Sequence, residues 1–88
     1  MATSNDVAMW MLENLKADGT LYQDVAASQI YDLFGEEFTA INQNGNLAIQ
    51  KAVLTAFNKL TPEGVVWVRS QRMWRPREDY DLPGRQQT

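Results

Sequence analysis

Four arginines alternate with apolar and aromatic residues near the C-terminal end of the chain. The arginines are Arg69, Arg72, Arg75 and Arg77, and the residues among and beside them include Trp67, Met73 and Trp74. A guanidinium group presents a rigid fork of N–H donors that fits phosphate or carboxylate oxygens. Aromatic rings in such a segment can stack on nucleic-acid bases or on arginine. This segment is therefore the first candidate for a binding surface.

A purely structural role for the same residues is the alternative. The tryptophans would then form the inner face of a hairpin that packs on helices, and the arginines would pair with acidic residues of the first half. Residues 1–50 hold seven acidic residues and one basic residue, whereas residues 51–88 hold seven basic and four acidic residues. Such a division suggests either a polarised surface or two halves that neutralise each other.

A second set of polar residues lies on the expected third helix, where Gln50 and Lys51 are the candidate binding residues. Glutamine and lysine are residue types that contact base edges and phosphates. The net charge of the whole chain is −3, however. Dedicated DNA-binding domains are usually basic, so composition alone does not distinguish nucleic acid from a protein partner.

No combination of residues typical of an enzyme is found. The chain has no His and no Cys, which excludes the commonest general base, the nucleophilic triads and the usual zinc ligands. Residues 44–46 contain a single glycine and do not form a glycine-rich phosphate loop. The acidic pairs at 36–37 and 78–79 are adjacent, so their side chains should point to different faces. We predict a non-catalytic protein without a metal or cofactor.

Three helices are expected to position the arginine segment. The first covers residues 5–17, with Thr3 or Ser4 as its cap and Gly19 after its end. The second covers residues 24–34, and the third follows an N-cap at Asn46 and ends before the Thr61-Pro62 step. The apolar residues at helical spacing predict the buried faces, which are Val7, Trp10, Met11 and Leu15; Ala26, Ile30, Leu33 and Phe34; and Ile49, Val53, Ala56, Phe57 and Leu60.

Extended segments complete the expected fold. Residues 20–22 are expected to form a very short strand or an extended lead-in to the second helix. Phe38 and Ile41 are expected to attach the following connector to the core. Residues 65–68 and 72–75 are expected to form a hairpin, in which a two-residue turn would place Trp67 opposite Trp74 and Val68 opposite Met73. Ser70-Gln71 is not a favoured pair for such a turn, so a longer loop with a shifted register is the alternative. Pro76 should end the second strand.

This order of elements resembles that of a winged-helix domain. The resemblance is carried by the patterns at residues 21–34, 46–60 and 65–75 and covers about residues 5–76. The chain also resembles a family of small uncharacterised bacterial proteins of that shape. The resemblance implies an α+β fold in which the second and third helices form a helix-turn-helix and the hairpin is the wing. Residues 35–45 depart from it, because they are longer than the roughly three or four residues of a tight turn.

The expected protein is one winged-helix-like domain at residues 1–77 with an irregular tail at residues 78–88. No apolar run has the length of a bilayer and the N-terminus does not resemble a signal peptide, so we expect a cytoplasmic protein without membrane contact. The expected function is a small non-catalytic binding module whose specific role is open, with nucleic acid as one candidate partner that would contact the arginine-rich wing and the third helix. The alternative is a protein-interaction or homo-oligomerisation domain. The identity of the partner is not encoded in any motif.

Overall fold

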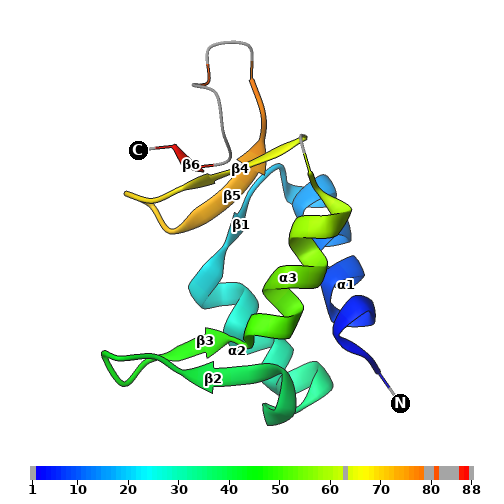
Figure 1. The fold of residues 1–88 in the computed structure, drawn as a ribbon, viewed down its shortest axis with the longest axis vertical. Coiled ribbons are helices and arrows are strands. Elements are labelled where there is room, and N and C mark those ends of the chain that lie inside the picture. The colour runs from blue at the N-terminus through cyan, green and yellow to red at the C-terminus, as the bar shows by residue number, and fades with distance from the viewer. Residues whose placement is uncertain (1, 63, 79–80, 82–85, 88) are drawn as a thin grey trace.

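The protein folds into three helices that pack against a four-stranded and a two-stranded sheet, as the computed structural model in Figure 1 shows. The structure describes residues 2–62, 64–78, 81 and 86–87. Its elements are α1 (Ser4–Asp18), β1 (Leu21–Tyr22), α2 (Gln23–Phe34), η1 (Glu36–Phe38), β2 (Thr39–Ile41), β3 (Leu47–Ile49), α3 (Lys51–Leu60), β4 (Val65–Val68), β5 (Met73–Pro76) and β6 (Gln86–Gln87). The predicted α+β class is confirmed. Within the described ranges, no helix has the length and apolar character needed to cross a bilayer.

Both ends of α1 carry the signals that the sequence predicted. The Thr3 hydroxyl accepts a hydrogen bond from the Asp6 N–H at 3.2 Å, and the Asp6 carboxylate accepts one from the Thr3 N–H at 2.9 Å. This reciprocal capping box satisfies two backbone donors that the helix itself cannot satisfy. At the other end Gly19 has a φ of 80° and its N–H bonds to the Leu15 carbonyl. Local chemistry therefore sets both boundaries of α1.

The core lies between the helices and one face of the larger sheet. Met11, Ile30, Val53 and Phe57 are fully buried in it, as their helical spacing predicted. The prediction for Leu33 is wrong, because this side chain is 64% exposed. The β2–β3 hairpin packs against α2 and moves the buried face of that helix toward Ala27.

The connector between α2 and α3 contains a hairpin that the sequence analysis did not predict. Strands β2 and β3 pair antiparallel, with Thr39 opposite Ile49 and Ile41 opposite Leu47. Phe38 is buried as predicted, whereas Ile41 is 67% exposed and does not attach the connector to the core. A two-stranded ribbon buries one face at most, and Ile41 lies near its outer end.

The start of α3 also differs from the prediction. Asn46 belongs to the hairpin turn and is not a helix cap, because the Asn42 side chain accepts hydrogen bonds from the Asn44 and Asn46 N–H groups at 2.9 and 3.0 Å. Gly45 supplies the φ of 79° that the turn requires. The N-cap of α3 is Gln50, whose side-chain oxygen accepts from the Ala52 N–H at 3.0 Å.

The larger sheet has the strand order β1-β5-β4-β6. The predicted register of the β4–β5 hairpin is confirmed, with Trp67 opposite Trp74 and Val68 opposite Met73. The two indole rings lie 4.7 Å apart, and Trp74 also meets Phe57 edge to face at 5.3 Å. The connection is the four-residue turn 69–72, since residue 72 is not part of the strand.

The predicted tail contributes two features to this sheet. Gln86 and Gln87 form β6, which pairs parallel with β4 at Trp67 and Val68. Asp81 bonds to Arg75 on β5. The predicted irregular residues 79–80, 82–85 and 88 lie outside the described residues.

Replacing Thr3 by Ala should lower the free energy of unfolding by about 1 kcal/mol, because the Asp6 N–H loses its acceptor. In a domain of this size, that loss lowers the thermal midpoint by roughly 5 °C. Thr3→Ser keeps the hydroxyl and serves as the control. Thermal unfolding followed by circular dichroism measures both variants, and an unchanged midpoint for Thr3→Ala would show that the box does not stabilise α1.

Candidate functional site

Arg69 and Arg72 lie in the turn between β4 and β5, and both are exposed. Arg72 has a φ of 54°, an uncommon backbone conformation for a residue other than glycine. Its carbonyl accepts a hydrogen bond from the Gln23 N–H at 3.0 Å, which holds the turn against the start of α2. The backbone at Arg72 is therefore fixed while its guanidinium group stays at the surface.

Arg75 forms an ion pair within the protein. Its guanidinium group binds Asp81 through two hydrogen bonds, Nη2 to Oδ1 at 2.6 Å and Nη1 to Oδ2 at 2.9 Å. The Arg75 side chain is 20% exposed and that of Asp81 is 2% exposed. The predicted internal pairing of the arginines therefore holds for Arg75, although its partner comes from the C-terminal segment and not from the acidic first half.

The pKa of Asp81 reflects this pairing. The hydrogen bonds from Arg75 are the main reason that the pKa falls from 3.8 to about 2, and the Glu78 N–H contributes through a 2.7 Å bond to the same carboxylate. The positive charges of Arg75 and Arg77 lower the pKa further. Arg77 is half-buried, and its N–H bonds to the Gly64 carbonyl. Arg75 and Arg77 therefore belong to the base of the hairpin, whereas Arg69 and Arg72 belong to its turn.

Trp74 and Gln50 occupy structural positions. Trp74 is 5% exposed and its ring packs on Phe57, so it lies in the core and is not available to stack on a partner. The Gln50 side chain is the N-cap of α3. Lys51 follows it in the first turn of that helix and is exposed. Three of the seven predicted site residues, Lys51, Arg69 and Arg72, are thus fully at the surface; we call them the basic set.

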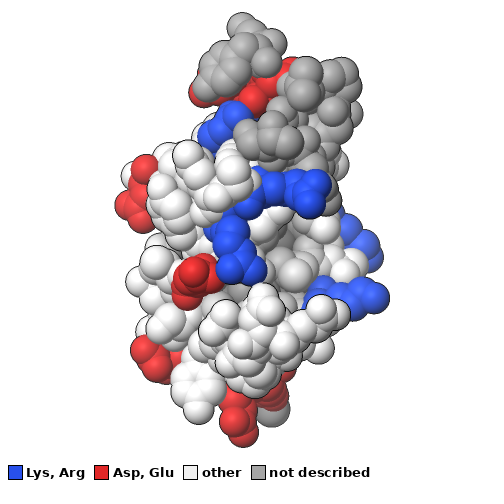
Figure 2. Space-filling view, turned by 90° about the vertical axis from the view of Figure 1, so that its left-hand side faces the viewer, with Lys and Arg blue, Asp and Glu red and all other residues white. Residues whose placement is uncertain are grey.

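A hollow lies beside Arg72 of the basic set. Its volume is about 370 Å³, and it is lined by Asp24, Ser28, Asn46, Leu47 and Arg72. It therefore lies between the start of α2, the start of β3 and the β4–β5 turn. In Figure 2, Lys and Arg side chains lie around the hollowed centre of this face and on one side of it, and Asp and Glu side chains lie along the other side and near the upper and lower ends. Acidic and basic side chains therefore both border the hollow, since Asp24 and Arg72 line it together.

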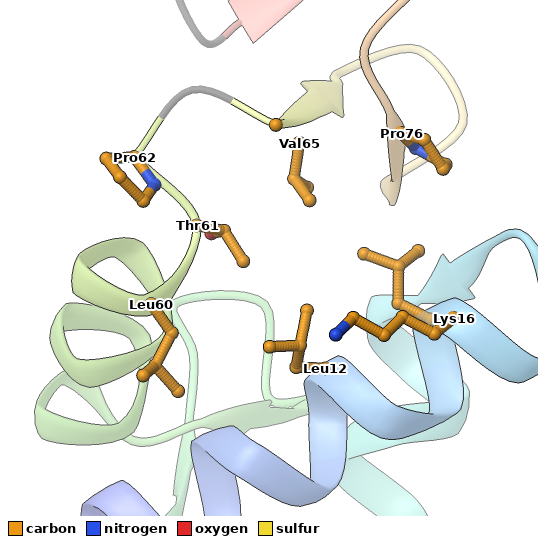
Figure 3. Close-up of a pocket in the computed structure, with 9 residues that line it drawn as sticks. Leu12, Lys16, Leu60, Thr61, Pro62, Val65 and Pro76 are labelled. Atoms are coloured by element: carbon orange, nitrogen blue, oxygen red, sulfur yellow. The ribbon is translucent and has the colours of Figure 1, made fainter.

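A second cavity has an apolar lining, and no pattern in the sequence predicted it. It lies between the C-terminal parts of α1 and α3 and the base of the β4–β5 hairpin, as Figure 3 shows. Leu12 and Leu60 line it and are only partly buried. Both residues sit at the edge of a helical apolar face, and a sequence pattern does not reveal that two such edges meet.

Asp81→Asn should remove part of the dependence of stability on pH. Because the folded protein holds the Asp81 pKa at about 2 and the ordinary value is 3.8, the carboxylate stabilises the fold above pH 3.8, and this contribution is lost as the pH falls through 2. The variant should therefore lose less stability than the natural chain in this interval. Urea unfolding at several pH values measures the difference, with the exposed Asp32→Asn as control. Parallel pH profiles for the natural chain and Asp81→Asn would contradict the role of the ion pair.

Comparison with known proteins gives a family but no function. No curated protein and no solved structure matches the chain. The chain matches a family of unknown function, DUF6953, over residues 3–76, from the cap of α1 to the last residue of β5. The match agrees with the predicted resemblance to a small uncharacterised family, and it covers most of the chain. The protein is therefore a member of the family of unknown function DUF6953.

Proposed function

We propose that the protein is a non-catalytic binding module that contacts the phosphate backbone of a nucleic acid through the basic set. The observation that carries the proposal is the exposure of Arg69 and Arg72 in one turn, with Arg72 in the lining of the hollow. Figure 2 shows cationic side chains beside the hollowed centre of one face. Exposed guanidinium groups bind phosphate oxygens through paired hydrogen bonds. The proposal includes the cytoplasmic location expected from the sequence, where nucleic acids are present.

A winged-helix-like arrangement forms part of the proposal. The order of α1, β1, α2, α3 and the β4–β5 hairpin supports it, as does the pairing of β1 with β5. The β2–β3 hairpin takes the place of the tight turn that would join the two helices of a helix-turn-helix. This difference argues against a binding mode in which α3 alone enters a groove.

The two hairpins suggest a different mode of contact. Their ends project toward the same side of the molecule (Figure 1). Both hairpins contribute to the lining of the hollow, the β2–β3 hairpin with Asn46 and Leu47 and the β4–β5 turn with Arg72. A nucleic-acid strand that crosses this side would touch the β4–β5 turn and pass Lys51 at the start of α3. Such contacts are made to phosphates and do not read bases, so we infer binding with little sequence preference.

The number of exposed cations determines the affinity for nucleic acid that we expect. Three cations neutralise few phosphates, so binding should be weak and should decrease with added salt. Asp24 in the lining of the hollow opposes an anion, which limits the affinity further.

The test is the binding of labelled single-stranded and duplex DNA, followed by fluorescence anisotropy at several salt concentrations. Replacing both Arg69 and Arg72 by Ala should reduce the slope of log K against log salt by about two units. Replacing both residues by Lys keeps the charges and should keep the slope.

A control for net charge adds two carboxylates at exposed positions other than those of the basic set. Ala17→Glu with Gln29→Glu changes the net charge by the same amount as the double Ala variant, at exposed positions of α1 and α2. This control should keep most of the salt slope. An absence of binding at low salt, or equal losses in the control and the double Ala variant, would overturn the proposal.

A protein partner is the second candidate, and exposed apolar residues on one side of α2 favour it. Val25 and Leu33 of α2 and Tyr22 of β1, which directly precedes α2, are exposed and lie near the acidic residues Asp24 and Asp32 in the sequence. Apolar residues with charged neighbours are typical of protein interfaces. In a self-association, this side of one copy would meet the basic set of another. Sedimentation at several protein concentrations in low salt tests it, and a monomer throughout would exclude a homo-oligomer.

A further inference from the structure

The apolar cavity of about 420 Å³ at the base of the β4–β5 hairpin has the size of a small-molecule site. Its lining comes from three regions that are distant in sequence. The residues are Leu12, Leu15 and Lys16 of α1, Leu60 at the end of α3, residues 61, 62, 64 and 65 of the following segment, and Pro76 of β5. Almost all of them are apolar, so the cavity favours an apolar ligand.

Lys16 adds a single positive charge to this lining. In Figure 3 its side chain runs along the cavity and its nitrogen points toward Leu12. No carboxylate within the described residues forms an ion pair with it. Lys16 is also the only basic residue among residues 1–50. An unpaired ammonium group beside an apolar cavity favours a ligand that is apolar along its body and anionic at one end.

Thr61, the other polar side chain of the lining, already forms a hydrogen bond within the protein. Thr61 is buried, and its hydroxyl donates a hydrogen bond to the Phe57 carbonyl at 2.8 Å. Among the side chains of the lining, the Lys16 ammonium is thus the polar group that can bond to a ligand and distinguish an anionic from an uncharged apolar ligand.

We propose that this cavity binds a small carboxylic acid with an apolar chain, of the class of medium-chain fatty acids. The chain lies among Leu12, Leu60 and Val65, and the carboxylate bonds to the Lys16 ammonium. The ligand thereby bridges α1, the end of α3 and the start of β4. Since these contacts exist only in the folded protein, the ligand raises the thermal midpoint, and the rise continues with the logarithm of the ligand concentration above the dissociation constant.

The full chain titrated with sodium decanoate below its micelle concentration tests the proposal, with amide shifts recorded by NMR. Saturable shifts should concentrate at Leu12, Lys16, Leu60 and Val65. Decanol has the same chain without the charge and should bind at the same place more weakly. Acetate has the charge without the chain and should cause no saturable shift.

Variants separate the roles of charge and cavity. Lys16→Met should weaken decanoate binding about threefold and leave decanol binding unchanged, because it removes the charge and keeps an apolar stem. Leu12→Trp should weaken both ligands by filling the cavity. Lys59→Met, at an exposed position of α3 outside the lining, should change neither.

Three results would overturn the proposal. They are the absence of saturable shifts with decanoate, shifts that concentrate at the exposed Tyr22 and Val25, or equal decanoate affinity for Lys16→Met and the natural chain. None of these measurements uses a nucleic acid, so the outcome is independent of the function proposed for the basic set.

Discussion

The packing of Trp74 joins the sheet to the helices, and the rest of the structure depends on it. Its ring lies against Phe57 of α3 and against Trp67 of β4, and its backbone pairs with Leu21 of β1. Aromatic pairs of this kind add to the stability from burial alone. Because one residue touches the helical core and both neighbouring strands, the register of β5 is firmly held. The positions of the residues on either side of Trp74 follow from that register.

The alternation of side chains along β5 then separates the arginines by role. Trp74 points to the core, so the next residue, Arg75, points to the opposite face of the sheet, where it meets Asp81. Arg72 precedes the strand, and a hydrogen bond from Gln23 to its carbonyl ties its backbone to α2. The same hairpin therefore holds one arginine in an internal ion pair and leaves two in its turn at the surface. A cluster that looks uniform in sequence divides into a structural part and an exposed part.

The hairpin also separates two kinds of surface. Its turn carries charge and borders the polar hollow, whereas its base borders the apolar cavity at Val65 and Pro76. The segment that links α3 to β4 contributes to that cavity. A polar partner and an apolar ligand could thus contact opposite ends of one rigid element. This arrangement makes the β4–β5 hairpin the part of the protein to which both proposals refer.

By itself the sequence determined the features that depend on neighbouring residues. Capping at Thr3 and Gly19, the stop before Pro62 and the pairing of Trp67 with Trp74 all follow from local chemistry or from one short turn. The β2–β3 hairpin was not predicted because Leu47 and Ile49 continue the apolar spacing of α3. Apolar spacing over so few residues fits a strand and a helical turn equally well. Only the tertiary structure decided which arginine is paired and that Leu12, Lys16 and Leu60 share a cavity. These outcomes depend on contacts between segments far apart along the chain, and no local pattern records which surfaces will meet.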